Sequence, residues 1–148
     1  MNFSIIKKQK AGIVMYNNNE LVLQETSRKQ HILIVDDNSM ILRNIKAILN
    51  DYFEVSVAPS GKHAFRSIEE NKPHLILLDY EMPEMNGKDV FLKLSSDENH
   101  KDIPVVFLTG IDSRQRVLDL LALKPAGYIL KPVNPDELME KIRGILRK

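Results

Sequence analysis

The chain has 148 residues, of which 43% are hydrophobic, and a formal net charge of +1 at pH 7. This length suits one ordinary domain with a substantial core, and the absence of cysteine excludes disulfides, thiolate metal sites and a cysteine nucleophile. The small net charge, without a basic stripe interleaved with aromatics, argues against direct binding to nucleic acid. The apolar runs are far shorter than the roughly 20 residues that span a bilayer, and residues 1–16 lack the apolar region of a signal peptide. We therefore predict a cytoplasmic protein with no direct contact with nucleic acid or membrane.

Residues 1–29 differ from the rest of the chain and are predicted to be an N-terminal extension. They carry five basic and two acidic residues, a formal charge of +3, while the remainder carries −2. The stretch IVMYNNNELVLQ, residues 13–24, suggests a hairpin around asparagines, which tolerate positive φ. Both strands would be apolar on both faces, so a free hairpin would be marginally stable. We favour a flexible leader or a remnant of an adjoining domain over an arm that docks on this domain or a neighbouring chain.

From residue 30 to residue 148, short apolar runs alternate with segments of helical period. The runs are HILIVD (31–36), FEVSVA (53–58), HLILLD (74–79), PVVFLT (104–109) and AGYIL (126–130). Three of them are nearly continuous in aliphatic residues, which is typical of central strands in a parallel sheet covered on both faces. Residues 53–58 alternate instead, which favours an edge strand.

Amphipathic segments with helix-start residues lie between these runs. Apolar residues at helical spacing are Ile41, Leu42, Ile45, Ile48 and Leu49, and again Leu138, Ile142, Ile145 and Leu146. Candidate N-caps are Ser60, Asn86, Asp112 and Asn134. Five strand-helix units predict an α/β fold with a doubly wound, five-stranded parallel sheet between two layers of helices, because right-handed crossovers place helices on both faces.

Polar residues stand where four of the predicted strands end. They are Asp36, Asp37, Asp79, Thr109 and Lys131. Sites in such sheets form outside the carboxyl ends of the strands, so these side chains are expected at one edge. Each alone could be a helix cap or surface charge, but independent caps have no reason to gather there.

Three neighbouring carboxylates would raise one another's pKa values and would need a cation. Mg²⁺ fits this donor set, since it prefers oxygen ligands, and Mn²⁺ is an alternative. The four histidines look scattered and suggest no zinc site; His74 is expected at a strand start, without a catalytic role. A carboxylate beside Mg²⁺ can act as a nucleophile toward a phosphoryl group, with an ammonium and a hydroxyl stabilising the transferred charge.

Four motifs resemble those of the receiver domains of two-component response regulators, with similarity in form to the chemotaxis regulators. They are VDDN (35–38), LLDYEMPEMNG (77–87), LTG (108–110) and YILKPV (128–133), in the family's order and approximate spacing. The resemblance covers residues 30–148 and implies a flavodoxin-like three-layer sandwich with strand order 2-1-3-4-5.

The resemblance implies a phosphorylated aspartate beside a metal ion. Asp79 would be the phosphoacceptor and also a metal ligand. Asp37 would bind Mg²⁺ directly, Asp36 would act through a metal-bound water, and Glu81 would contribute its backbone carbonyl.

It also implies a set of residues around the phosphoryl group. Thr109 and Lys131 would contact the phosphoryl oxygens, and the peptide between Lys131 and Pro132 would be cis. Tyr128 would be the aromatic switch residue, although a tyrosine on an edge strand is otherwise half-buried packing.

Two of these motifs end in a glycine. Gly87 is expected to close the turn after the acceptor by adopting backbone angles that larger residues avoid. Gly110 is expected to leave room for a phosphodonor.

The resemblance implies a phosphoacceptor switch rather than an enzyme, apart from self-catalysed phosphoryl transfer to Asp79 and its hydrolysis. Its partners would be a sensor histidine kinase or phosphotransfer protein, and a downstream protein bound by the last helix-strand-helix surface. The chain would be a monomer or a phosphorylation-linked homodimer.

Two departures from the commonest pattern leave questions open. KPAGY, residues 124–128, replaces the frequent small and acidic run, so the family's best-described dimer surface is not assumed. The acidic Glu81 side chain stands where the attacking water must pass, so the phosphoryl lifetime is open.

Three alternatives remain. The chain could be a receiver module cut from a larger hybrid kinase or multidomain output protein, or a receiver that acts without phosphorylation. A doubly wound flavin or phosphatase domain is disfavoured, because DDNSM (36–40) is acidic where a flavin phosphate would bind, and because Glu81 replaces a phosphatase's second aspartate.

Overall fold

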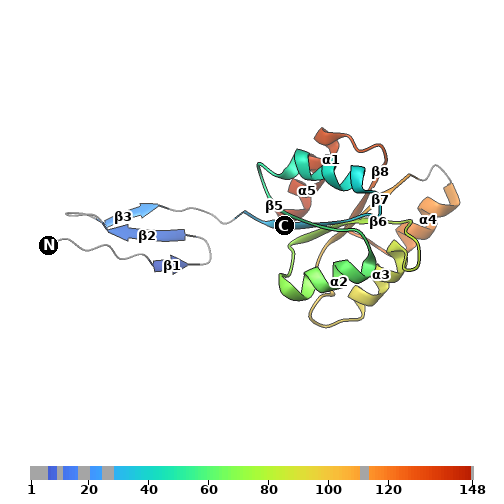
Figure 1. The fold of residues 1–148 in the computed structure, drawn as a ribbon, viewed down its shortest axis with the longest axis horizontal. Helices are drawn as coiled ribbons and strands as arrows, with labels where there is room; N and C mark the ends of the chain where they lie inside the picture. Colours follow the sequence, from blue (N-terminus) through green and yellow to red (C-terminus); the bar gives the residue numbers. More distant parts are fainter. Residues whose placement is uncertain (1–6, 10–11, 17–20, 25–28, 111–113, 148) are drawn as a thin grey trace.

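The computed structural model describes residues 7–9, 12–16, 21–24, 29–110 and 114–147. Its larger part is a sheet of five parallel strands, with helices on both faces (Figure 1). The strands are β4 (His31–Val35), β5 (Glu54–Ala58), β6 (Leu75–Asp79), β7 (Val105–Thr109) and β8 (Gly127–Leu130). Their spatial order is β5-β4-β6-β7-β8. This confirms the predicted order 2-1-3-4-5 and the edge position of residues 53–58.

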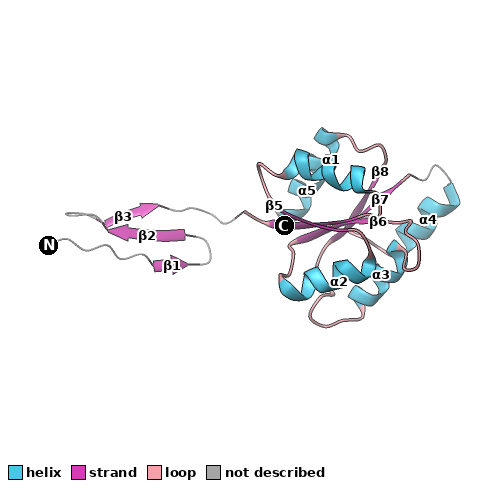
Figure 2. Ribbon diagram, in the orientation of Figure 1, coloured by secondary structure: helices cyan, strands magenta, loops and turns pink. Residues whose placement is uncertain are grey.

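Five helices complete a three-layer arrangement. They are α1 (Ser39–Leu49), α2 (Gly61–Glu70), α3 (Gly87–Ser95), α4 (Arg114–Ala122) and α5 (Pro135–Leu146). Figure 2 shows α1 and α5 on one side of the sheet, and α2 and α3 on the other. The flavodoxin-like sandwich predicted from the sequence is therefore confirmed.

Two apolar clusters, one on each face of the sheet, hold the layers together. Successive residues of a strand point to opposite faces, so Ile32 and Ile34 pack with α1 and α5, whereas Leu33 and Val35 pack with α2 and α3. All residues of β4, β6 and β7 are buried. Such strands can be apolar throughout, which explains the continuous runs in the sequence.

Side-chain caps fix where several helices begin. Ser60, Asn86 and Asn134 each accept a hydrogen bond from a backbone N–H of the first turn, as predicted. Asn38 caps α1 in the same way and was not predicted. Asp112, the cap proposed for α4, lies outside the described residues.

The described part of residues 1–28 forms a separate three-stranded antiparallel sheet. Its strands are β1 (Lys7–Gln9), β2 (Gly12–Tyr16) and β3 (Leu21–Gln24), in the order β1-β2-β3. β2 and β3 pair with Tyr16 opposite Leu21, and the asparagines between them lie outside the described residues. The boundary between the extension and the larger domain stays a prediction. Among the described residues, no helix has both the length and the apolar character needed to cross a membrane.

Candidate functional site

Three carboxylates converge at the carboxyl edge of the sheet. Asp36 follows β4, Asp79 ends the neighbouring β6, and one carboxylate oxygen each from Asp36, Asp37 and Asp79 can be chosen so that all lie within 4.8 Å of one another. Asp36 and Asp79 are buried, whereas Asp37 is exposed. Two buried acids this close repel each other and need a compensating charge.

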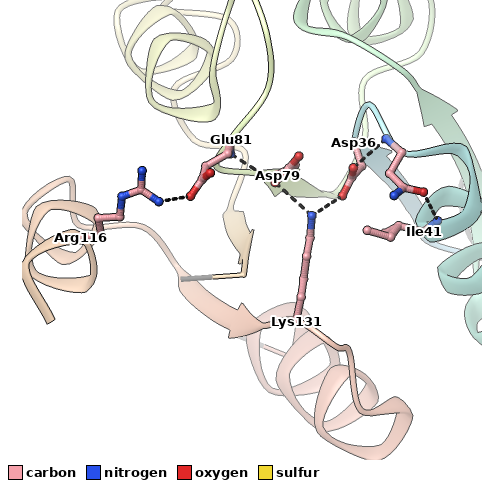
Figure 3. A network of polar contacts seen from close by, with 7 residues as sticks. Asp36, Ile41, Asp79, Glu81, Arg116 and Lys131 are labelled. Atoms are coloured by element: carbon pink, nitrogen blue, oxygen red, sulfur yellow. Dashed lines mark hydrogen bonds and ion pairs between the residues drawn. The ribbon is translucent and has the colours of Figure 1, made fainter. Parts of the chain in front are cut away.

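Lys131 supplies that charge from the end of β8, the edge strand on the side of β7. It follows β8, and its Nζ lies 2.9 Å from Asp36 Oδ2 and 3.1 Å from Asp79 Oδ1, so one ammonium bridges both acids (Figure 3). The Lys131–Pro132 peptide bond is cis, and the Lys131 N–H donates to the Thr109 carbonyl at 2.7 Å. Burial alone would lower the pKa of Lys131, but Asp36 and Asp79 outweigh it and raise the pKa above its ordinary value.

Asp79 is a weaker acid here than in water. Burial, and after it the Asp36 carboxylate, raises the pKa of Asp79 to about 6, although Lys131 opposes the shift. Asp79 Oδ1 also accepts a hydrogen bond from the Glu81 backbone N–H at 3.2 Å. The carboxylate is therefore ionised above about pH 6, but its charge remains incompletely compensated.

The donor set fits a hard divalent cation. Asp36 Oδ1 accepts a hydrogen bond from the Asn38 N–H at 2.9 Å. The buried Oδ2 has no hydrogen bond of good geometry with any described residue and lies 2.9 Å from the Lys131 Nζ. Together with Asp37 and Asp79, this leaves oxygen donors available at one point, and Mg²⁺ takes oxygen ligands and one or two carboxylates. The pairing of Asp36 with Lys131 was not foreseen from the sequence.

The Glu81 side chain leads away from the acids to a residue that sequence reasoning missed. Arg116 of α4 donates a hydrogen bond to Glu81 Oε1 and forms an ion pair with it (Figure 3). Arg116 lines the same cavity as Asp79 and Lys131. No sequence motif identifies Arg116, and its contact with Glu81 depends on how α4 packs on the domain.

Thr109 and Tyr128 share one face of the sheet. Thr109 ends β7 and is buried, and it lies opposite Leu130 in the β7–β8 register. Tyr128 stands two residues before Leu130, so strand alternation places it on the face of Thr109. Tyr128 is half-buried and packs against the apolar cluster on the side of α2 and α3.

Gly87 is required for a reason that differs from the predicted one. None of the described glycines has a positive φ, so the expectation of special backbone angles at Gly87 is wrong. A Cβ at Gly87 would instead stand 2.3 Å from the Asp79 carbonyl oxygen. Gly110 lines the cavity, and a Cβ there would meet nothing within 4 Å.

Two of the histidines are not scattered. His74 directly precedes β6, as predicted, but its Nδ1 accepts the His31 backbone N–H at 2.8 Å. This contact lies at the amino edge of the sheet, opposite the acidic cluster. It therefore adds nothing to the candidate site.

Comparison with known proteins identifies the class. Residues 32–143 match the model of the response regulator receiver domain, so the chain belongs to that family. Receiver domains of two-component response regulators generally bind Mg²⁺ and interact with histidine kinases or phosphotransfer proteins.

Individual relatives occur at two lengths. Chemotaxis protein CheY1 of Helicobacter pylori is 36% identical over 118 residues, which are 78% of this chain and 95% of the relative. The DNA-binding response regulator MtrA of Mycobacterium tuberculosis is 34% identical over 121 residues, 81% of this chain and 52% of the relative.

A solved structure shows the same fold. The signal receiver domain of a histidine kinase from Syntrophus aciditrophicus has a TM-score of 0.74 at 28% identity and covers 80% of this chain and 90% of its own.

Proposed function

We propose that this chain is a phosphoacceptor switch, phosphorylated on Asp79 in a Mg²⁺-dependent reaction, that passes a signal on by changing conformation. The observation that carries the proposal is the Lys131 ammonium held between the carboxylates of Asp36 and Asp79. A single buried acid would be either protonated or neutralised by one basic side chain of its own. This site instead keeps a nucleophile, a second acid and one shared ammonium together.

The Asp79 carboxylate is the nucleophile in this proposal. One of its oxygens attacks the phosphorus of a phosphohistidine or a small acyl phosphate, and the bond from phosphorus to the leaving group breaks with its electron pair on the leaving group. Asp79 must be ionised to attack, so its pKa of about 6 permits reaction at neutral pH. The donor would be a sensor histidine kinase or a phosphotransfer protein, and loss of the phosphoryl group would be self-catalysed.

Neighbouring groups stabilise the transferred phosphoryl group. Lys131 already lies 3.1 Å from Asp79 Oδ1, so its Nζ can follow the new phosphoryl oxygens with a small movement. The Thr109 hydroxyl, at the end of the adjacent strand β7, is the second donor. Preorganised donors of this kind stabilise charge without large reorganisation.

Asp36, Asp37, Asp79 and the Glu81 backbone carbonyl would hold Mg²⁺, with Mn²⁺ as an alternative. When bound, the metal ion supplies positive charge to the phosphoryl oxygens. Asp37 is the exposed member of the set and Asp36 the buried one, which suits direct binding by Asp37 and support from Asp36.

The output would run through Thr109 and Tyr128. Movement of Thr109 toward the phosphoryl group would open space on the face that Tyr128 shares, and ligand-driven changes of this kind select one of two arrangements. The surface of α4, β8 and α5 would then change shape and bind a downstream protein. The chain would act as a monomer or as a phosphorylation-linked homodimer.

Intact-mass spectrometry after incubation with acetyl phosphate tests the proposal. Wild type with Mg²⁺ should gain one phosphoryl group, and wild type with EDTA should gain none. Asp79→Asn should stay unlabelled, while Asp97→Asn, an acid outside the cavity, should be labelled like wild type. Equal labelling of Asp79→Asn would contradict the assignment of the acceptor.

A further inference from the structure

Arg116 stands beside the acceptor site but is only loosely held there. Its guanidinium pairs with Glu81, and the two side chains are 54% and 52% exposed. Exposed ion pairs are weak, because water solvates both charges and the side chains lose entropy on pairing. Arg116 can therefore leave Glu81 at little cost.

The charges around Asp79 favour movement of Arg116 away from Glu81 once a phosphoryl group is present. The charged residues described along the cavity are Asp36, Asp37, Asp79, Glu81, Lys131 and Arg116. Lys131 is already shared between two buried acids at 2.9 and 3.1 Å. A phosphoryl group adds about two negative charges. Among the described residues that line the cavity, Arg116 is the remaining cation, and its present partner is weak.

Glu81 keeps Arg116 within reach of the phosphoryl group. The Glu81 backbone N–H donates to Asp79 Oδ1 at 3.2 Å, while its carboxylate binds Arg116, so one residue contacts both. Figure 3 shows dashed contacts that lead from Arg116 to Glu81, from Glu81 to Asp79 and from Asp79 to Lys131. A guanidinium can donate two parallel hydrogen bonds to phosphate oxygens, which makes a phosphoryl group a stronger partner than an exposed carboxylate.

We propose that Arg116 is a phosphoryl-binding residue that pairs with Glu81 while Asp79 is unmodified and moves to the phosphoryl oxygens once Asp79 is phosphorylated. This inference rests on the proposed phosphorylation of Asp79. It makes Glu81 a competitor for Arg116, and it makes the lifetime of the phosphorylated state depend on a residue of α4.

The lifetime of the phosphorylated chain tests this directly. Each variant is labelled with acetyl phosphate and Mg²⁺, the donor is removed, and the phosphorylated fraction is followed by intact mass. Arg116→Gln should lose its phosphoryl group about fivefold faster than wild type, the loss expected for one modest charged interaction. Arg116→Lys, which keeps the charge but not the planar fork, should fall between the two.

Arg114→Gln is the matched control, because it removes the same charge from the first residue of α4. Arg114 forms no ion pair with any described residue. Its lifetime should equal that of wild type. If Arg116→Gln and Arg114→Gln both match wild type while Asp79→Asn stays unlabelled, Arg116 does not bind the phosphoryl group and the proposed function stands. If wild type itself takes no phosphoryl group, both proposals fail.

Nuclear magnetic resonance of the arginine Nε–H group gives a second readout, on the Arg116 side chain itself. The Arg116 signal, assigned by its loss in Arg116→Lys, should shift when acetyl phosphate and Mg²⁺ are added to wild type and should stay in place in Asp79→Asn. An unmoved signal in a chain that intact mass shows to be phosphorylated would overturn the inference.

Discussion

The two ends of strands β4 and β6 both place polar groups in the interior, but they handle charge differently. At the amino ends, the buried His31 donates its backbone N–H to His74 Nδ1 at 2.8 Å, and its Nε2 lies 2.7 Å from Ser56 Oγ. Burial lowers the pKa of His31. The imidazole is therefore mostly neutral at pH 7, and its Nε2 has a hydrogen-bond partner that carries no charge.

At the carboxyl ends, the same physical effect leaves a charge problem unsolved. Burial raises the pKa of Asp79, but only to about 6, so the group is mostly ionised at neutral pH beside a second buried acid. One ammonium offsets two carboxylates. Binding a cation is favourable at the carboxyl edge because negative charge there is incompletely compensated. The amino edge has no such excess of negative charge, so we assign it a structural role.

Replacing Lys131 should have the largest effect on this contrast. Lys131→Met leaves Asp36 buried without its counter-charge, and removing one partner of a buried pair costs about 3–4 kcal/mol. We expect that loss in the free energy of unfolding at pH 7.5 in EDTA, measured by urea denaturation, and a further rise in the pKa of Asp79. Lys131→Arg keeps the charge and should lose much less. Equal losses in the two variants would mean that packing, rather than charge, makes this position important.

A methyl group at Gly87 should disturb the carboxyl edge through space alone. Because the new Cβ would stand 2.3 Å from the Asp79 carbonyl oxygen, the backbone must shift, and we expect Gly87→Ala to lower the free energy of unfolding by about 3 kcal/mol. Gly144→Ala in α5 is the control, since its Cβ meets nothing within 4 Å and a helical glycine costs about 1 kcal/mol relative to alanine. It should be stabilised in the same thermal or urea experiment. A neutral Gly87→Ala would show that the turn after β6 adapts freely.

The raised pKa of Asp79 predicts a stability that depends on pH. The folded-state value of about 6 exceeds the ordinary value of 3.8, so this group's stabilising contribution is complete below pH 3.8 and is lost as the pH rises through 6. Asp79→Asn cannot ionise. It should be more stable than wild type by on the order of 2 kcal/mol at pH 7.5 in EDTA, and the gap should close near pH 4.

Adding Mg²⁺ to both proteins sharpens this test. The metal should stabilise wild type more than Asp79→Asn and so narrow the gap at pH 7.5. If the difference in free energy of unfolding between the two proteins is the same at pH 4 and pH 7.5, ionisation of Asp79 does not destabilise the fold as predicted.

The features that sequence reasoning predicted are those set by local pattern. Continuous apolar runs identified the central strands, and polar residues directly after them identified Asp36, Asp79 and Lys131 as neighbours, because parallel strands end at a common edge. The parallel sheet and the carboxylate cluster follow from these two rules, whereas the strand order came from the resemblance to receiver domains. The resemblance to receiver domains then supplied roles that the residues alone do not give.

Contacts that depend on register or helix rotation were missed. His31 and His74 are 43 residues apart, and they touch because β4 and β6 start side by side. Arg116 meets Glu81 only through the way α4 packs, which no periodicity in residues 114–122 indicates. The closeness of Gly87 to the Asp79 carbonyl is likewise a matter of packing distance, whereas the sequence suggested a matter of backbone angles.

The smallest expected effect tests the amino edge. His31→Gln keeps a polar side chain near Ser56 but loses the ring, and the loss of one buried hydrogen bond predicts a drop of about 1 kcal/mol in the free energy of unfolding at pH 7.5. Because the pKa of His31 is lowered on folding, the contribution of His31 to stability should fall as the pH drops below 6.5, so the gap between wild type and the variant should narrow over that range. Phosphorylation of Asp79, followed by intact mass, should be unchanged, since the substitution lies at the opposite end of β4. A variant that folds but accepts phosphate much more slowly would show that the two ends of the strand are coupled, and the separation between a structural edge and a reactive edge would then be wrong.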